Sequence, residues 1–246
     1  MVDNRYATAL VIGSVLSLLA SVYLSVAVGT QHWYQYRSPP VSNDADNGSA
    51  LRELELEFSD EDVWERNYST AMFRLNGSLG LWWRCILIQS PGSAPVSKCE
   101  AFTLPQQFEV KYRGLNISNE EDLLRTALWR CRFIFPLVSL GLVFLAALVG
   151  VCACLCRSLT PTLFVGLLHL LAALCSMATV CCFLAGADLL HEALRWPEEG
   201  QSSSLGWSLY LALISSPLQM MAAALFTWAA RSHRKNYTRM TAYRVA

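Results

Sequence analysis

Four long apolar runs constrain this chain more than any other feature of its sequence. They cover residues 6–29, 133–152, 161–186 and 205–230, and none of them contains Lys, Arg, Asp or Glu. An α-helix needs about 20 residues to cross the hydrocarbon core of a bilayer. Backbone polar groups in lipid must be satisfied within the segment, so such runs are expected to be helical. The sequence therefore predicts a protein that crosses the membrane four times, with both termini on the same side.

The whole chain, residues 1–246, is predicted to fold as a single unit. Its expected parts are a first span at 6–29, a first extracellular loop at 30–127, a second span at 128–152, a cytoplasmic loop at 153–160, a third span at 161–186, a second extracellular loop at 187–206, a fourth span at 207–230 and a cytoplasmic tail at 231–246. The first run is read as a retained span, because its apolar core is far longer than that of a secretory signal peptide.

The distribution of charge predicts the orientation in the membrane. Seven of the 19 basic residues lie in the short segments 1–5, 153–160 and 231–246, against only one of the 19 acidic residues, Asp3. Lys and Arg close to span ends are retained on the cytoplasmic side. We therefore expect both termini in the cytoplasm and the two long connections outside the cell.

The cysteines divide by compartment. Cys85 and Cys99 are the only two in the predicted extracellular loops, so a disulfide there has a single possible connectivity. Cys152, Cys154 and Cys156 lie at the cytoplasmic end of the second span. They are candidates for S-palmitoylation, or equally three reduced thiols at a lipid interface. No metal site is expected, because neither His nor a carboxylate accompanies this spacing.

Four Asn-x-Ser sequons lie in the first extracellular loop and predict N-glycosylation. They are Asn47, Asn67, Asn76 and Asn116. We expect two or three to carry glycans, with Asn76 the least accessible because Asn76-Gly77 predicts a hairpin turn. A fifth sequon at Asn236 lies in the cytoplasmic tail and should remain bare.

The same loop contains two contrasting stretches. Residues 44–65 hold nine acids and one base, which predicts a solvated, weakly structured surface or, alternatively, a region that attracts cations or basic partners. Short β-like pieces follow at 72–75, 81–88 and 101–104. Ser118 and Glu121 then form a capping box, which predicts a helix that begins outside the membrane and continues into the second span.

Two features inside the spans also require interpretation. Small residues recur at every fourth position of the first span and predict one closely packed helix face. They are Ala9, Gly13, Ser17, Ser21, Ser25 and Gly29. His169 is the one titratable side chain deep in a span. It is either a functional group or a neutral imidazole bonded to a neighbouring helix.

A constellation in the first loop resembles a known family. Trp33, then Gly80-Leu81-Trp82, then Cys85 and Cys99 follow the order of the signature shared by claudins, peripheral myelin proteins and epithelial membrane proteins, and Arg125 resembles the arginine that follows it there. The resemblance implies a mainly α membrane fold, with a four-transmembrane-helix bundle and a small extracellular antiparallel β-sheet. It also implies that one strand comes from the second loop. Trp33 and Trp82 are expected to anchor the sheet at the lipid surface.

The functional expectation is non-enzymatic. No HExxH, GxSxG, P-loop or GxGxxG motif occurs, so we expect no cofactor, no nucleic acid and no small-molecule substrate. The resemblance implies a plasma-membrane glycoprotein of cell–cell contacts that is surrounded by lipid and binds itself or other claudin-like proteins in cis or in trans. The alternatives are an auxiliary subunit of a channel or receptor, and a paracellular channel that prefers cations.

Overall fold

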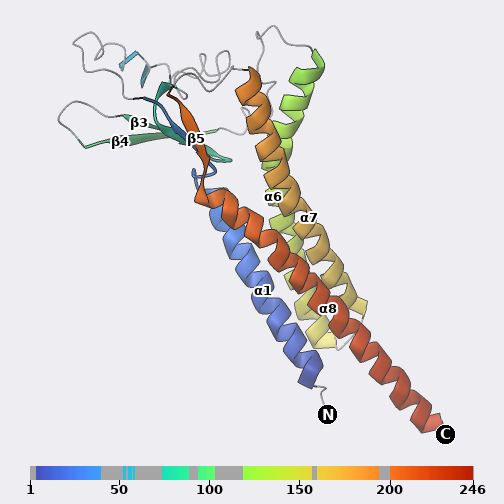
Figure 1. Cartoon of the computed structure of the whole chain (residues 1–246). Helices are drawn as coiled ribbons and strands as arrows, with labels where there is room; N and C mark the ends of the chain where they lie inside the picture. The colour runs from blue at the N-terminus through green and yellow to red at the C-terminus, as the bar shows by residue number, and fades with distance from the viewer. Residues whose placement is uncertain are drawn as a thin grey trace. The chain divides into compact units, whose positions relative to one another are not determined.

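The computed structural model describes residues 4–39, 52–53, 55–56, 58, 74–88, 94–102, 119–156, 160–193 and 200–245 (Figure 1). Its elements, in chain order, are α1 (Asn4–Gly29), β1 (Tyr34–Arg37), β2 (Gly77–Leu79), β3 (Trp83–Ile88), β4 (Val96–Ala101), α6 (Asn119–Cys156), α7 (Thr160–Ala193), β5 (Ser202–Leu205) and α8 (Trp207–Val245). They form two compact units, a helical unit of Met1–Val26, Ile134–Thr179 and Leu211–Ala246, and a sheet unit of Ala27–Phe133 and Val180–Tyr210.

Among the residues that the structure describes, four helices are long and apolar enough to cross a membrane. The spans are Tyr6–Gly29, Leu123–Cys152, Pro161–Leu189 and Trp207–Ser232. Together with the small antiparallel sheet, they confirm the mainly α, four-span fold class. The backbone of α8 stays helical beyond its span as far as Val245.

The helical unit is held together by apolar packing and by close approach of its helices, which lie side by side (Figure 1). Its core contains Ala146, Val165, Leu168, Ala222 and Phe226. A Cβ added at Gly166 on α7 would lie 2.7 Å from the Thr227 side chain of α8, so glycine allows this contact. Ser216 on α8 donates a hydrogen bond of 2.9 Å to the Ala173 carbonyl of α7. Close packing and interhelical hydrogen bonds of this kind hold membrane helices together.

The small-residue stripe of α1 packs only along its first half. Ala9, Gly13 and Ser17 are buried, whereas Ser25 and Gly29 are exposed. A step of four residues advances about 40° around a helix with 3.6 residues per turn, so a strict four-residue stripe leaves the packed face. The prediction of one continuous packed face is therefore wrong for the second half of the helix.

The sheet unit contains five antiparallel strands in the order β4-β3-β2-β1-β5. β5 comes from the second predicted loop and pairs with β1, so Tyr34 lies opposite Leu205. The predicted turn at Asn76-Gly77 is wrong: Gly77 begins β2 and pairs with Ile86, and the turn between β2 and β3 is at 80–82. β4 lies earlier than the piece predicted at 101–104, because its register with β3 and not its own polar sequence places it. Residues 72–73 and 103–104 lie outside the described residues.

The acidic segment contributes to the core of the sheet unit. Phe58 is buried in a cluster with Leu75 and Ile86. Glu55 forms an ion pair of 3.3 Å with Lys98 on β4. The prediction of a purely solvated surface is therefore wrong at these positions, since the segment supplies an apolar side chain to the sheet.

Candidate functional site

Trp33 lies at the point where the end of α1 meets the sheet. Its side chain is fully buried, and its indole Nε1 donates a hydrogen bond of 2.7 Å to the Ala27 carbonyl. That carbonyl belongs to the last turn of α1, whose carbonyls have no partner within the helix. The ring packs 5.0 Å from the ring of Phe183 on α7. Trp33 therefore packs inside the sheet unit, where it connects the end of α1 to α7. Its predicted place at the lipid surface is wrong.

Two glycines allow the backbone segments around Trp33 to cross. A Cβ on Gly80 would lie 2.6 Å from the Thr30 carbonyl oxygen and 2.8 Å from Cα of Gln31. A Cβ on Gly206 would overlap the backbone of His32. Backbone atoms cannot move aside as a flexible side chain can. Sequence reasoning identified Gly80 through the motif but missed Gly206, which has no motif around it.

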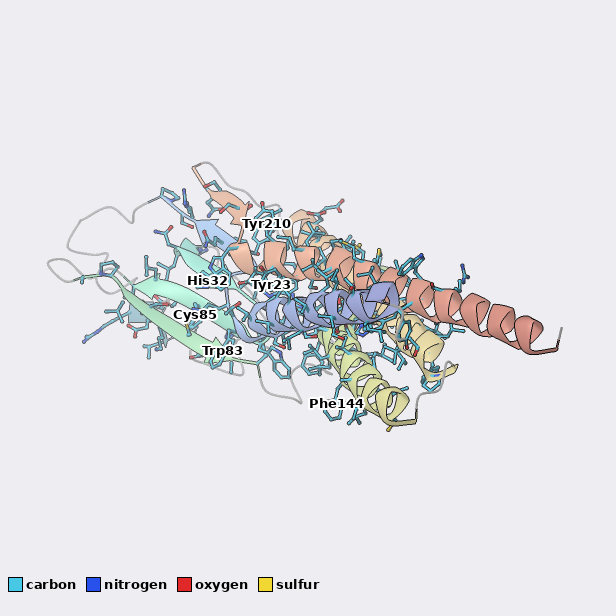
Figure 2. All side chains as sticks on the ribbon, turned by 90° about the horizontal axis from the view of Figure 1, so that it is seen from below. Tyr23, His32, Trp83, Cys85, Phe144 and Tyr210 are labelled. Atoms are coloured by element: carbon cyan, nitrogen blue, oxygen red, sulfur yellow. A yellow bond between two sulfur atoms is a disulfide. The ribbon has the colours of Figure 1, made fainter. Side chains whose placement is uncertain are left out.

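Of the two residues after Gly80, Leu81 is buried and Trp82 is half-buried. The ring of Trp82 meets Phe133 of α6 edge-on with 4.5 Å between ring centroids. The carbonyl of Trp82 accepts a hydrogen bond of 2.7 Å from the backbone of Phe102. Trp83, by contrast, is 37% exposed (Figure 2). Trp82 is thus the tryptophan of this pair that packs against a helix.

A covalent bond and an ion pair connect β3 to β4 at consecutive positions. Cys85 and Cys99 lie directly opposite each other and form the predicted disulfide (Figure 2). At the next pair, Arg84 and Glu100 form an ion pair of 2.6 Å. The Arg84 guanidinium is buried and lies 4.9 Å from the ring centroid of Phe58. Sequence reasoning missed this ion pair because it depends on the register of β4.

Two arginines of α6 are buried in the sheet unit. Arg125 is the residue identified through the family resemblance, and it is almost fully buried. Arg132 was missed, although it lies inside the span Leu123–Cys152. Its guanidinium lies 3.4 Å from the ring centroid of Trp129 and 5.5 Å from that of Phe183. Such cation–π contacts stabilise a charge that is removed from water. They connect α6 to α7 through the same Phe183 ring that contacts Trp33.

One face of the sheet contains a groove. An open groove of about 640 Å³ crosses β1, β2 and β3, and its lining includes Gln35, Arg37, Ser78 and Leu87. Its size is within the range of small-molecule sites, but its open shape is more typical of a contact surface.

The other face of β1 packs against the end of α7. The rings of Tyr34 and Tyr36 lie 5.3 Å and 5.9 Å from the imidazole of His191. Burial lowers the pKa of His191, and the nearby Asp188 carboxylate only partly opposes this effect. The imidazole is therefore held in its neutral form over a wider pH range than a solvated histidine.

The predicted modification sites are mostly outside the described residues. Asn47, Asn67 and Asn116 are among these, whereas Asn76 is half-buried and accepts a hydrogen bond of 2.8 Å from the backbone of Ser38. Cys152 is exposed on α6. The side chains of Cys154 and Cys156 are not described, so palmitoylation remains a prediction. Among the described residues, no group of three or more His, Cys, Asp or Glu could hold a metal ion.

A comparison with known families covers most of the chain. The family model described as PMP-22/EMP/MP20/Claudin tight junction matches residues 18–228. The match includes all four spans, at least in large part, and every strand of the sheet.

Proposed function

Because the chain belongs to the PMP-22/EMP/MP20/claudin family, we propose that this tetraspan membrane protein is a non-enzymatic cell-surface glycoprotein that organises cell–cell contacts. It associates with copies of itself or with other claudin-like proteins, in its own membrane and across to the next cell. Both termini are cytoplasmic in this proposal, and the sheet unit faces the extracellular space at the plasma membrane.

The observation that carries this proposal is the pair of strands β3 and β4, which a disulfide and an ion pair hold together. β4 is an edge strand, and its first residue, Val96, is 63% exposed. An edge strand offers unpaired backbone groups that can pair with a strand of another chain. The disulfide and the Arg84–Glu100 ion pair order the hairpin in advance, so association costs less conformational entropy.

The proposal is tested at the edge strand. Val96→Lys places a charge on the edge, which disfavours strand pairing. Leu56→Lys is the matched control, because Leu56 is 71% exposed but lies outside the sheet. In cells that express one variant only, both proteins should reach the surface in equal amounts. Only Val96→Lys should lose accumulation at contacts. Equal accumulation of the two variants would contradict a role for this edge in association.

Freeze-fracture of the same cells separates the proposal from its alternatives. Strands of particles at contacts would support self-assembly. Dispersed particles, with a channel or receptor that purifies with the protein, would instead support the role of an auxiliary subunit. Ion permeability that rises with expression and prefers cations would support a paracellular channel.

The orientation is tested by glycosylation. Replacing Asn47, Asn67, Asn76 and Asn116 together by Gln should reduce the protein to a single unglycosylated mass. A glycan that remains on Asn236 would contradict the proposed topology.

A finer placement within the family rests on several short stretches. The chain falls in the subgroup of claudin domain-containing proteins in this proposal, because it resembles them at residues 3–9, 36–39, 124–126, 128–131, 152–159 and 242–246. The first extracellular loop, about twice as long as in true claudins, agrees with this placement.

A further inference from the structure

The helical unit contains a cleft that the proposed function does not use. The cleft has a volume of about 690 Å³ and is lined by residues of α1, α6 and α7, with Phe226 of α8. Most of its wall is apolar, including Leu10, Val143 and Phe144. Six side chains with polar atoms also line it. They are Tyr6, Ser14, Ser17, Ser21, Thr162 and His169.

His169 is the side chain of this wall whose hydrogen bonding is least satisfied. Its side chain is only 2% exposed and stacks on the Phe226 ring at 5.3 Å. Nε2 lies 3.4 Å from the hydroxyl oxygen of Ser17, which is a long hydrogen bond. Nδ1 has no hydrogen-bond partner in the part of the chain that the structure describes. A buried nitrogen without a partner is unfavourable in an apolar environment, and ionisable residues inside membrane spans generally mark functional sites.

The polar side chains form two groups along the helices, with Tyr6 and Thr162 at one end of the cleft and Ser14, Ser17, Ser21 and His169 around the middle of the spans. Tyr6 and Thr162 lie at or next to the first residues of the spans Tyr6–Gly29 and Pro161–Leu189, which places them near one surface of the bilayer. Ser17, which contacts His169, lies at the middle of the span Tyr6–Gly29. The rise of an α-helix puts Tyr6 and Ser17 about 16 Å apart along α1, and Thr162 and His169 about 10 Å apart along α7. A complementary ligand therefore has two polar ends joined by an apolar body.

We propose that this cleft binds one neutral, rigid lipid with a hydroxyl group at each end, which is the chemistry of a side-chain-hydroxylated sterol. One hydroxyl lies near Tyr6 and Thr162, and the other bonds to the Ser17 hydroxyl and Nε2 of His169, in place of the long hydrogen bond between them. A hydroxyl both donates and accepts, so it matches either tautomer of a neutral imidazole. A rigid body holds its two hydroxyls at a constant separation and loses little conformational entropy on binding. The volume is that of a site for one small molecule.

The test uses the purified full chain in detergent and a radiolabelled side-chain-hydroxylated sterol as the probe. His169→Phe keeps a ring against Phe226 but removes both ring nitrogens, including the Nε2 that lies beside Ser17. Its affinity for the hydroxylated sterol should fall at least tenfold, while its affinity for cholesterol, which lacks the second hydroxyl, stays at the wild-type value. In the wild type, the hydroxylated sterol should bind at least tenfold more tightly than cholesterol. Equal affinities for the two sterols, or an unchanged affinity in His169→Phe, would overturn the proposal.

A second pair of variants keeps the test decisive if His169→Phe does not fold. Gly150 lines the cleft, and a Cβ added there would meet only a Val165 methyl group at 4.0 Å, so Gly150→Leu extends into the open volume. Gly141 is on the same helix but does not line the cleft, and it has open space around it, so Gly141→Leu is the control. Binding should be lost in Gly150→Leu and retained in Gly141→Leu. Equal binding by both, or displacement of the probe by a hydroxylated fatty acid at equal concentration, would refute a rigid two-hydroxyl ligand in this cleft.

Discussion

Gly80→Ala tests the close backbone crossing on which the sheet unit depends. The new Cβ would lie 2.6 Å from the Thr30 carbonyl oxygen and 2.8 Å from Cα of Gln31, where ordinary van der Waals contact begins near 3.4 Å. Two backbone segments must therefore separate by more than half an ångström. Overpacking of this kind destabilises a protein by about 1–3 kcal/mol. Gly141→Ala is the matched control, because its Cβ meets no atom within 4 Å and alanine stabilises a helix interior by about 0.5–1 kcal/mol.

The two variants should therefore differ in their free energies of unfolding by about 1.5–4 kcal/mol, which is roughly one to three powers of ten in the unfolding equilibrium. The measurement is denaturant unfolding of the purified full chain in detergent, followed by tryptophan fluorescence, with surface biotinylation in cells as a second readout. Gly80→Ala should also be retained inside the cell. If Gly80→Ala unfolded at the same denaturant concentration as Gly141→Ala, the backbone crossing would not control stability and the reasoning would be wrong.

Three further predictions follow from the sheet unit. Cys85→Ser should lose about 3 kcal/mol of stability, the chain-entropy value for a loop of this size, and normal surface levels of this variant would show that the disulfide is dispensable. Trp82→Ala should reduce surface expression much more than Trp83→Ala, because only Trp82 packs on Phe133; equal tolerance would contradict that anchoring role. Burial lowers the pKa of His191 below the ordinary histidine value of 6.5, so the unfolded chain binds a proton more readily and stability should fall as the pH drops below that value. His191→Phe should weaken this pH dependence in thermal unfolding scans, and an unchanged dependence would assign it to other groups.

The sequence was sufficient for features that depend on local composition. Apolar runs without charge predict spans because the bilayer acts on each helix separately, and the four spans appear close to the expected positions. The disulfide was also predictable, since only two cysteines lie in the predicted extracellular loops.

Tertiary contacts decided the features that depend on strand register and on close approach between distant segments. The polar sequence of β4 has little strand signal, and its position follows from pairing with β3 along its whole length. The same register brings Arg84 to Glu100, which no local pattern indicates. Phe58 lies within the acidic stretch 44–65, so its burial was not expected from the sequence. Only the folded sheet provides the apolar side chains that bury it.

Trp33 combines one feature that the sequence predicted with one that only the tertiary structure decided. Its place in the motif was visible in the sequence, but an amphipathic indole suits a lipid surface as well as a protein interior. The deciding factor is that Phe183 and the Ala27 carbonyl, separated by more than 150 residues, meet around it in the folded chain. Composition thus sets which segments enter the membrane, whereas burial at a particular position depends on neighbours that only the tertiary structure brings together.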